Sequence, residues 1–417
     1  MTDQTPQPPA DEPHPYEANH YASLVINLGR ALLHVGSPSH RLEAAMQIMA
    51  QRLGLTAEFF STPTALLVSL GDGSKQQTFL ARSDPGSANL SKLADLTEVM
   101  RALADHEITP EKADEQVRAI DQAPPIYGWG WQLLGFMILA MGIAPILGGG
   151  LKEALLSCGL GLVVGTAVLT LRRHVERSRL ITPLAATLVT FLGTIWCGLD
   201  PTTALLPAVT AGMIVLLPGM DLTVAARELA TGHVVSGSSR LAFGLTVLAL
   251  LGLGMVIGGV LGQALVGPVP VTYSPDRVYL TSFIGLSLAA AGLMLLNQAH
   301  KKDWPWMFLA CVVAWLLAGL GNTFDAPVIG AFLGALAVGI SGNVFVSLTG
   351  RPGSIMHIPG LIVLVPGSIG FRSVTSLLSD DVVTGIETAL LTAIIAIALT
   401  TGMMLASVLM PPKKNVL

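Results

Sequence analysis

The chain contains one stretch twice. Residues Ile214–Gly237 read IVLLPGMDLTVAARELATGHVVSG, and 148 residues later Ile362–Gly385 read IVLVPGSIGFRSVTSLLSDDVVTG, with nine of the 24 positions identical. Each copy is an apolar run broken by Pro-Gly, followed by a short amphipathic segment and a long apolar helix. Proline removes a backbone donor and glycine loosens the backbone, so each run should end or unwind there. In lipid such a break is tolerated only where it is buried in protein or lines a cavity.

Two matched breaks in two matched halves predict a transport site. The residues expected at its hinge are Pro218, Gly219, Pro366 and Gly367. Each break exposes helix ends whose partial charges can hold the carboxylate and the ammonium group of an amino acid. Each proline should also free the carbonyl four residues before it, which is that of Ile214 or Ile362.

Composition supports a membrane protein. Of 417 residues, 52% are hydrophobic and only 12% are charged, with a mean hydropathy of +0.64, whereas a soluble domain carries about twice that charge. Residues 1–125 hold 16 acidic and 9 basic side chains, and residues 126–417 hold 11 acidic and 14 basic ones. We therefore expect a polar domain before a membrane domain. This mild acidity offers no basic patch, so nucleic acid is not an expected partner. The three cysteines have no metal spacing, and we expect neither metal nor cofactor.

The polar part divides in two. Residues 1–16 are rich in proline and predict a disordered tail, and residues 17–125 predict a small cytosolic α+β domain. Within that domain, hydrophobic spacing and turn residues predict helices near 21–33 and from Leu42, strands near 57–60, 65–70 and 77–82, and helices near 90–105 and 110–120. Thr109 and Pro110 should cap the last helix.

Ten apolar segments follow, at roughly 20 residues per span. They lie near residues 129–148, 152–171, 181–198, 202–217, 241–266, 278–297, 305–321, 326–348, 355–367 and 386–410. We divide them into a first five-helix repeat over 126–267 and a second over 278–410, which makes the protein mainly α and polytopic. Because five is an odd number, the second repeat must enter the membrane from the opposite side, so the repeats are inverted. This arrangement suits alternating access around a midplane site. A duplication that no longer transports is the alternative.

Loop charge supports an N-terminus on the inside. The inner loops then contain Arg172, Arg173, Arg177, Arg179, Arg227, Arg240, Lys301, Lys302, Arg351, Lys413 and Lys414, and the outer loops contain only Arg277 and Arg372 as basic residues, beside Asp276, Asp325, Asp380 and Asp381. We expect a multi-pass protein of the bacterial cytoplasmic (inner) membrane with both termini in the cytoplasm.

This organisation resembles the threonine/serine exporter family. The resemblance covers about residues 20–410 and rests on the cytosolic domain, on the two five-span units and on the motif Gly36-x-x-x-His40-Arg41-Leu42-Glu43. It implies export of threonine and serine driven by the proton gradient, with the substrate, protons and the lipid bilayer as partners. A homo-oligomer is left open. Some relatives, split into two chains, are associated with export of dicarboxylates such as succinate, and the sequence does not decide between these substrates.

Several polar residues are candidates for transport chemistry, and each has a structural alternative. Asn343 and Arg372 are candidates for substrate contact, or for helix packing and a pair with an aspartate. The candidates for proton coupling are Asp200, Asp221, Glu228, His357 and Glu387. Asp200 is equally an N-cap for the fourth span. Asp221 and Glu228 could simply form a solvated helix face, and Glu153 beside Lys152 reads as a surface pair.

An enzyme is the competing class. Gly339-Ile340-Ser341-Gly342 matches the G-x-S-G of rhomboid-like intramembrane serine proteases, with His357 as the base. Such a pattern is weak in a chain with 44 glycines, because small residues also let helices approach each other. No G-x-x-x-x-G-K-[ST] occurs, so ATP-driven transport is not encoded. We therefore expect a transporter and no enzyme.

Overall fold

The computed structural model describes residues 15–71, 76–82, 88–171, 180–269, 279–324, 326–364, 367–378 and 381–411. Backbone contacts divide the chain into two compact units, residues 1–87 with 92–123, and residues 88–91 with 124–416. Several positions used above to infer topology lie outside the described residues: Arg172, Arg173, Arg177, Arg179, Asp276, Arg277, Asp325, Asp380, Lys413 and Lys414. The predicted tail lies almost wholly outside them too.

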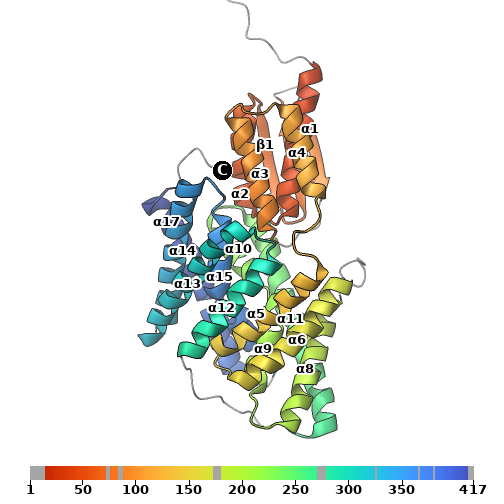
Figure 1. The fold of residues 1–417 in the computed structure, drawn as a ribbon, viewed down its shortest axis with the longest axis vertical. Helices are drawn as coiled ribbons and strands as arrows, with labels where there is room; N and C mark the ends of the chain where they lie inside the picture. The colour runs from red at the N-terminus through yellow and green to blue at the C-terminus, as the bar shows by residue number, and fades with distance from the viewer. Residues whose placement is uncertain are drawn as a thin grey trace, which may run out of the picture. The chain divides into compact units, whose positions relative to one another are not determined.

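The N-terminal unit has helices on a three-stranded antiparallel sheet of order β1-β2-β3 (Figure 1). Its elements are α1 (Pro15–His34), α2 (Ser39–Arg52), β1 (Ala57–Thr62), β2 (Ala65–Leu70), β3 (Gln77–Arg82), α3 (Leu90–Ala104) and α4 (Pro110–Gln122). Leu28, Met46 and Leu66 are buried in its core. Thr109 caps α4 as predicted, because its side chain accepts a hydrogen bond from the backbone N–H of Lys112. The predicted α+β content is therefore present.

The second unit is helical. Its elements are α5 (Trp129–Ile146), α6 (Leu151–Leu171), α8 (Ile181–Leu199), α9 (Leu205–Gly212), η2 (Ile214–Leu216), α10 (Gly219–Ala230), α11 (Val234–Val266), α12 (Tyr279–Leu296), η3 (Lys301–Asp303), α13 (Trp304–Thr323), α14 (Pro327–Thr349), α15 (Ser354–Leu364), α16 (Gly367–Leu378) and α17 (Val382–Leu409). Each of the ten predicted apolar segments coincides with one or more of these helices.

Eight helical stretches in the described part of the chain are long and apolar enough to cross a membrane, and nine if the bent pair of α9 with η2 and α10 is one span. A shorter apolar helix covers Thr281–Leu296. Many large apolar side chains on these helices are exposed, among them Leu188, Leu261 and Ile397, as lipid-facing residues would be. The prediction of a mainly α, polytopic membrane protein is therefore confirmed.

The first helix of each predicted repeat, α5 in one and α12 in the other, packs closely against its counterpart. A Cβ placed on Gly142 of α5 would lie 2.4 Å from the backbone N of Ala289 and from the carbonyl O of Gly285, both on α12. A Cβ on Gly285 would in turn lie 2.5 Å from the carbonyl O of Gly142. Only glycine permits this backbone approach, which is the packing that small residues allow between membrane helices.

Candidate transport site

The first Pro-Gly break unwinds the apolar run, as predicted. Helix α9 ends at Gly212, the short 3₁₀ helix η2 follows, and α10 begins directly after Pro218. Helix α9 (Leu205–Gly212) and the segment Ile214–Ala230 that follows Met213 are bent by 58° relative to each other. Pro218 cannot donate to the carbonyl of Ile214, which accepts instead a hydrogen bond of 3.3 Å from the N–H of Leu217. The tighter 3₁₀ turn thus satisfies it locally.

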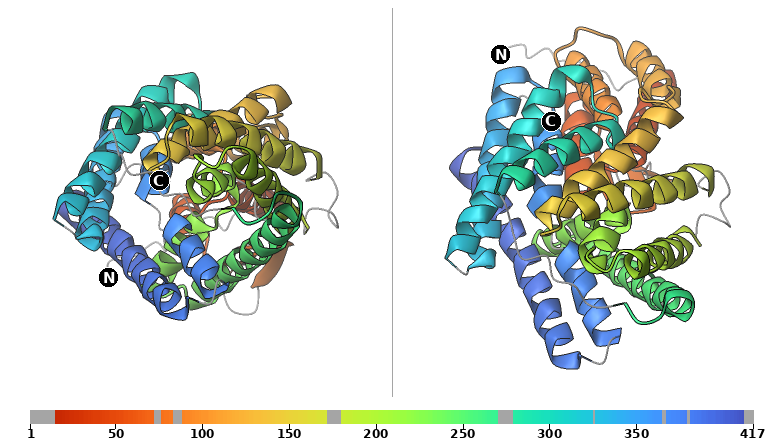
Figure 2. Two further views of the ribbon diagram at one scale, coloured as in Figure 1. Left: turned by 90° about the horizontal axis from the view of Figure 1, so that it is seen from below. Right: turned by 60° about the horizontal axis from the view of Figure 1, so that its bottom comes forward.

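The second Pro-Gly lies between α15 and α16, whose described residues are Ser354–Leu364 and Gly367–Leu378. Ser354–Leu377 together are long and apolar enough for one membrane span. Pro366 lies outside the described residues, so a break at this position stays a prediction. The two Pro-Gly sites meet in space, since a Cβ placed on Gly367 would lie 3.3 Å from Cα of Gly219. Gly219 is the first residue of α10 and Gly367 is the first described residue of α16, so these segments contact each other there; Figure 2 shows the helices from two further directions.

The hairpin that follows each break has the same internal register. A Cβ on Gly237 of α11 would lie 2.7 Å from Cγ of Leu229, and the equivalent Cβ on Gly385 of α17 would lie 2.5 Å from Cγ of Leu377. Each residue of one pair lies 148 positions from its counterpart in the other. The sequence repeat therefore corresponds to a repeated packing of α10 on α11 and of α16 on α17.

A second contact is also repeated in both hairpins. In the first hairpin its glycine lies on the long helix, and in the second hairpin its glycine lies on the short helix. In the first hairpin Gly244 faces Leu222, whose Cδ2 would lie 2.9 Å from a Cβ on the glycine. In the second hairpin Gly370 stands at the position of the leucine and faces Thr392, whose Cγ2 would lie 3.2 Å from such a Cβ. A small residue opposite a larger one thus keeps both helix pairs close.

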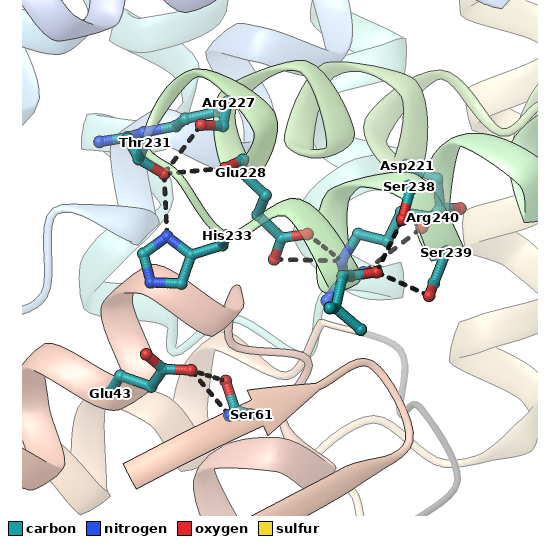
Figure 3. Close-up of polar contacts among 11 residues, drawn as sticks. Glu43, Ser61, Asp221, Arg227, Glu228, Thr231, His233, Ser238, Ser239 and Arg240 are labelled. Carbon is teal, nitrogen blue, oxygen red and sulfur yellow. Dashed lines mark hydrogen bonds and ion pairs between the residues drawn. The ribbon is translucent and has the colours of Figure 1, made fainter. Parts of the chain in front are cut away.

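A buried ion-pair network joins the two helices of the first hairpin (Figure 3). Glu228 on α10 is fully buried, and both its carboxylate oxygens accept a hydrogen bond from Nε of Arg240 on α11, at 3.3 and 3.1 Å. Nη1 of Arg240 also lies 3.6 Å from Oδ1 of Asp221. The side chains of Arg240 and Asp221 are 15% and 35% exposed. Of the two predicted roles, a solvated helix face is therefore wrong for Glu228.

The turn between α10 and α11 adds two further polar groups to this region. The hydroxyl of Thr231 accepts from or donates to Nδ1 of His233 at 3.1 Å, and it lies 2.9 Å from the carbonyl O of Arg227 (Figure 3). Nε of Arg227 is buried and makes no hydrogen bond among the residues that the structure describes. Two carboxylates and two guanidinium groups are thus concentrated in one short hairpin.

The candidates of the second half are placed differently. Asn343 on α14 is buried, and its amide donates to the carbonyls of Ala406 at 3.4 Å and Met410 at 2.9 Å, so it ties α14 to the end of α17. This favours the packing interpretation of Asn343. Arg372 and Glu387 are exposed.

His357 is 5% exposed and packs against α14, where its Nε2 would lie 2.1 Å from a Cβ placed on Gly342. The ring therefore occupies space that a side chain at this position would fill. The hydroxyl of Ser341, the nucleophile of the competing protease interpretation, donates to the carbonyl of Val338 in its own helix at 3.1 Å.

Asp200 does not cap the fourth span. It follows α8, while the residue that precedes α9 is Ala204. Its carboxylate accepts hydrogen bonds from Nζ of Lys152 at 2.7 Å and from the hydroxyl of Thr202 at 2.5 Å. These bonds hold the pKa of the Asp200 carboxyl well below its usual range. The prediction of an N-cap was wrong because the turn before α9 is longer than the sequence spacing indicated.

Glu153 is a structural residue that our interpretation as a surface pair missed. It is 4% exposed, and its two carboxylate oxygens accept hydrogen bonds of 2.7 Å from the backbone N–H groups of Gly150 and Ala204. The first bond is that of a capping box at the start of α6, and the second holds the start of α9. The sequence signal was Gly150 followed three residues later by a glutamate.

In the N-terminal unit, the motif that carries the resemblance lies at the turn between α1 and α2. Gly36 has φ of 75°, a conformation that glycine adopts without strain. Glu43 on α2 accepts hydrogen bonds from the backbone N–H of Ser61 at 2.7 Å and from its hydroxyl at 3.0 Å, which ties α2 to β1. His40 and Arg41 are partly buried. Across the described residues, no group of three or more His, Cys, Asp or Glu side chains could hold a metal ion.

Comparison with known proteins identifies two matching family models. Residues 23–262 match ThrE, described as "Putative threonine/serine exporter", and residues 282–409 match ThrE_2, described as "Threonine/Serine exporter, ThrE". The two matches together cover both halves of the membrane unit and most of the N-terminal unit.

Curated fungal proteins are similar over most of this chain. Pheromone-regulated membrane protein 10 of Pichia sorbitophila is 27% identical over 381 residues, which are 85% of this chain and 37% of the relative. The protein of that name in Saccharomyces cerevisiae is 27% identical over 85% of this chain and 47% of its own length. Uncharacterized protein C16A10.01 of Schizosaccharomyces pombe is 24% identical over 88% and 45%. The chain therefore spans less than half the length of these relatives. No solved structure matches.

Proposed function

Because the chain belongs to the threonine/serine exporter family, we propose that it is a secondary active exporter of small hydrophilic amino acids, threonine and serine, coupled to protons. The observation that carries the proposal is the contact between the two matched Pro-Gly sites, where a Cβ on Gly367 would lie 3.3 Å from Cα of Gly219. Broken helices that meet inside a membrane protein are a recurring design of transport sites.

The proposed mechanism uses the two hairpins as moving parts. Helices α10 and α16 contact each other at Gly219 and Gly367, and each packs on the following long helix in the same register. A contact between equivalent positions of the two copies is what an inverted repeat would produce. Movement of one hairpin would open the site to one side of the membrane, and the equivalent movement of the other would open it to the opposite side. The N-terminal partial charges of both helices are available to a substrate carboxylate.

The orientation remains a proposal that rests on loop charge. We place both termini and the N-terminal unit in the cytoplasm. The bacterial inner membrane expected from the resemblance stays a prediction, because the relatives reported above are fungal. A transporter family argues against the protease interpretation, and we expect no proteolysis of a model transmembrane substrate.

The test is transport by purified full-length protein in proteoliposomes with labelled threonine, serine and succinate, with and without a pH gradient. The proposal expects threonine and serine to be transported against their gradients when the pH gradient is imposed, and succinate to be left behind. Preferential transport of succinate would assign the chain to the dicarboxylate exporters. No movement of any of the three would contradict the proposed function.

A further inference from the structure

Among the described residues, the ion-pair network of the first hairpin has no counterpart at the equivalent positions of the second hairpin. Asp221, Glu228 and Arg240 of the first hairpin correspond, 148 residues later, to Ile369, Ser376 and Thr388 of the second, none of which is charged. The second hairpin is joined instead by a neutral hydrogen bond of 2.7 Å from the hydroxyl of Ser373 to the carbonyl of Gly385. The two hairpins thus share their packing and differ in their electrostatics.

Two carboxylates that differ in burial lie beside the guanidinium group of Arg240. Glu228 is fully buried and Asp221 is 35% exposed, and Arg240 reaches both from α11. Arginine stays charged at any pH that a cell meets, so only a carboxylate can change the charge of this group. A buried carboxylate depends on its partner for its charge, because an uncompensated ion in a low-dielectric site is strongly disfavoured.

Other titratable groups near α10 are few. Arg227 lies on α10 itself, and His233 lies in the turn that follows it. Helices α15, α16 and α17 also pack on α10, and their titratable residues are His357, which packs against Gly342, and the exposed Arg372 and Glu387. Among these groups, Glu228 combines full burial with a direct ion pair.

We propose that Glu228, Arg240 and Asp221 form the proton-coupling site and that the proton acts on the first hairpin alone. The inference rests on the proposed function and adds a location and a carrier to it. A proton from water forms an O–H bond with a carboxylate oxygen of Glu228, which becomes neutral. Arg240 then loses its ion pair with Glu228 and keeps the one with Asp221. The attraction between α11 and the C-terminal part of α10 is therefore weakened. Loss of the proton restores the pair.

The test separates coupling from transport. Purified full-length variants in proteoliposomes are compared in two assays: accumulation of threonine driven by a pH gradient, and exchange of threonine between equal pools at equal pH. Glu228→Gln mimics the protonated carboxyl, so we expect it to lose accumulation and to keep exchange. The double variant Glu228→Gln with Arg240→Gln removes both charges of the buried Glu228–Arg240 pair and should behave in the same way if Glu228→Gln alone is poorly produced. Lys152→Gln, which removes the exposed pair with Asp200, is the matched control and should keep both activities.

Two results would overturn the inference. Wild-type accumulation by the double variant would show that the proton binds elsewhere. Loss of both accumulation and exchange by a double variant that reaches the membrane would assign the network a structural role only. The proposed function fails separately, since its failure appears in the wild-type protein, which would then move neither threonine nor serine.

Discussion

Gly219 and Gly367 are in contact, since a Cβ placed on Gly367 would lie 3.3 Å from Cα of Gly219. The two residues are 148 positions apart and occupy the same place in the duplicated stretch. Gly219 is the first residue of α10, and Gly367 is the first described residue of α16. The equivalent positions of the two copies are therefore in contact with each other, as expected of residues on or near the axis that relates two halves.

Enlarging either glycine should stop export. Gly367→Leu would force a branched side chain against Cα of Gly219, where overpacking is not relieved without backbone movement. Gly219→Leu adds the same side chain to the other residue of this contact. We expect both variants to reach the membrane and to lose nearly all threonine transport in proteoliposomes. Under the proposed inverted arrangement, Gly219→Leu alters access from the inner side and Gly367→Leu alters access from the outer side.

Gly159→Leu is the control for this experiment. A Cβ on Gly159 of α6 would meet nothing within 4 Å, so the same substitution there should leave transport near the wild-type level. If both hinge variants export as well as Gly159→Leu, the breaks merely end helices and the hinge hypothesis is wrong.

The sequence predicted the helices well because apolar runs of membrane length and Pro-Gly breaks act locally. The same is true of Thr109, whose capping role follows from its place before Pro110. It also indicated that two separated stretches are related. It could not predict that Gly219 and Gly367 touch, because contact between distant segments depends on the packing of all the helices between them.

Side-chain partners were harder to predict than helices. The sequence named no partner for Glu228, which pairs with Arg240 on the next helix. Glu153 was paired with its neighbour Lys152, but it bonds to Gly150 and Ala204. For Glu153 sequence adjacency was misleading, because neighbouring residues on a helix point in different directions.

The close approach of α5 and α12 should tolerate no side chain at Gly142. Gly142→Leu would place a Cβ 2.4 Å from the backbone of α12, so the helices must separate, at a cost of about 1–3 kcal/mol or more. We expect a lower thermal unfolding temperature in detergent and reduced yield of folded protein. Gly319→Leu on α13, where a Cβ would meet nothing within 4 Å, should unfold close to the wild-type temperature.

Glu153 should matter for stability through both of its oxygens. In Glu153→Gln one oxygen becomes an NH₂ group, which faces a backbone N–H of Gly150 or Ala204 whichever way the amide is turned. One donor is then left unsatisfied, at a cost of about 1–3 kcal/mol. Thermal unfolding should reveal this loss, and Glu387→Gln, at an exposed glutamate, should not show it. Equal stability of the two variants would contradict the buried role of Glu153.

The Lys152–Asp200 pair predicts a specific loss of stability in acid. Hydrogen bonds from Lys152 and Thr202 hold the pKa of Asp200 below its usual range, and an unfolded aspartate has a pKa of about 3.9. The stabilisation is therefore complete above that unfolded value and is lost as the pH falls through the lower folded pKa. Unfolding of wild type and Lys152→Gln in detergent should differ near neutral pH and converge in strong acid. A difference that persists unchanged in strong acid would exclude this linkage.

The inverted arrangement predicts that the two hairpins end on opposite sides of the membrane, and thiol labelling can test this. In a background without Cys158, Cys197 and Cys311, we expect Ser376→Cys on α16 to react with a membrane-impermeant thiol reagent added outside the cell. Ser238→Cys, near the start of α11, should react only after the membrane is opened. The physical basis is that an inverted repeat places the ends of the two equivalent hairpins on opposite sides of the membrane, while α10 and α16 stay in contact at Gly219 and Gly367. Labelling of both positions from the same side would contradict the inverted repeat and the alternating mechanism built on it.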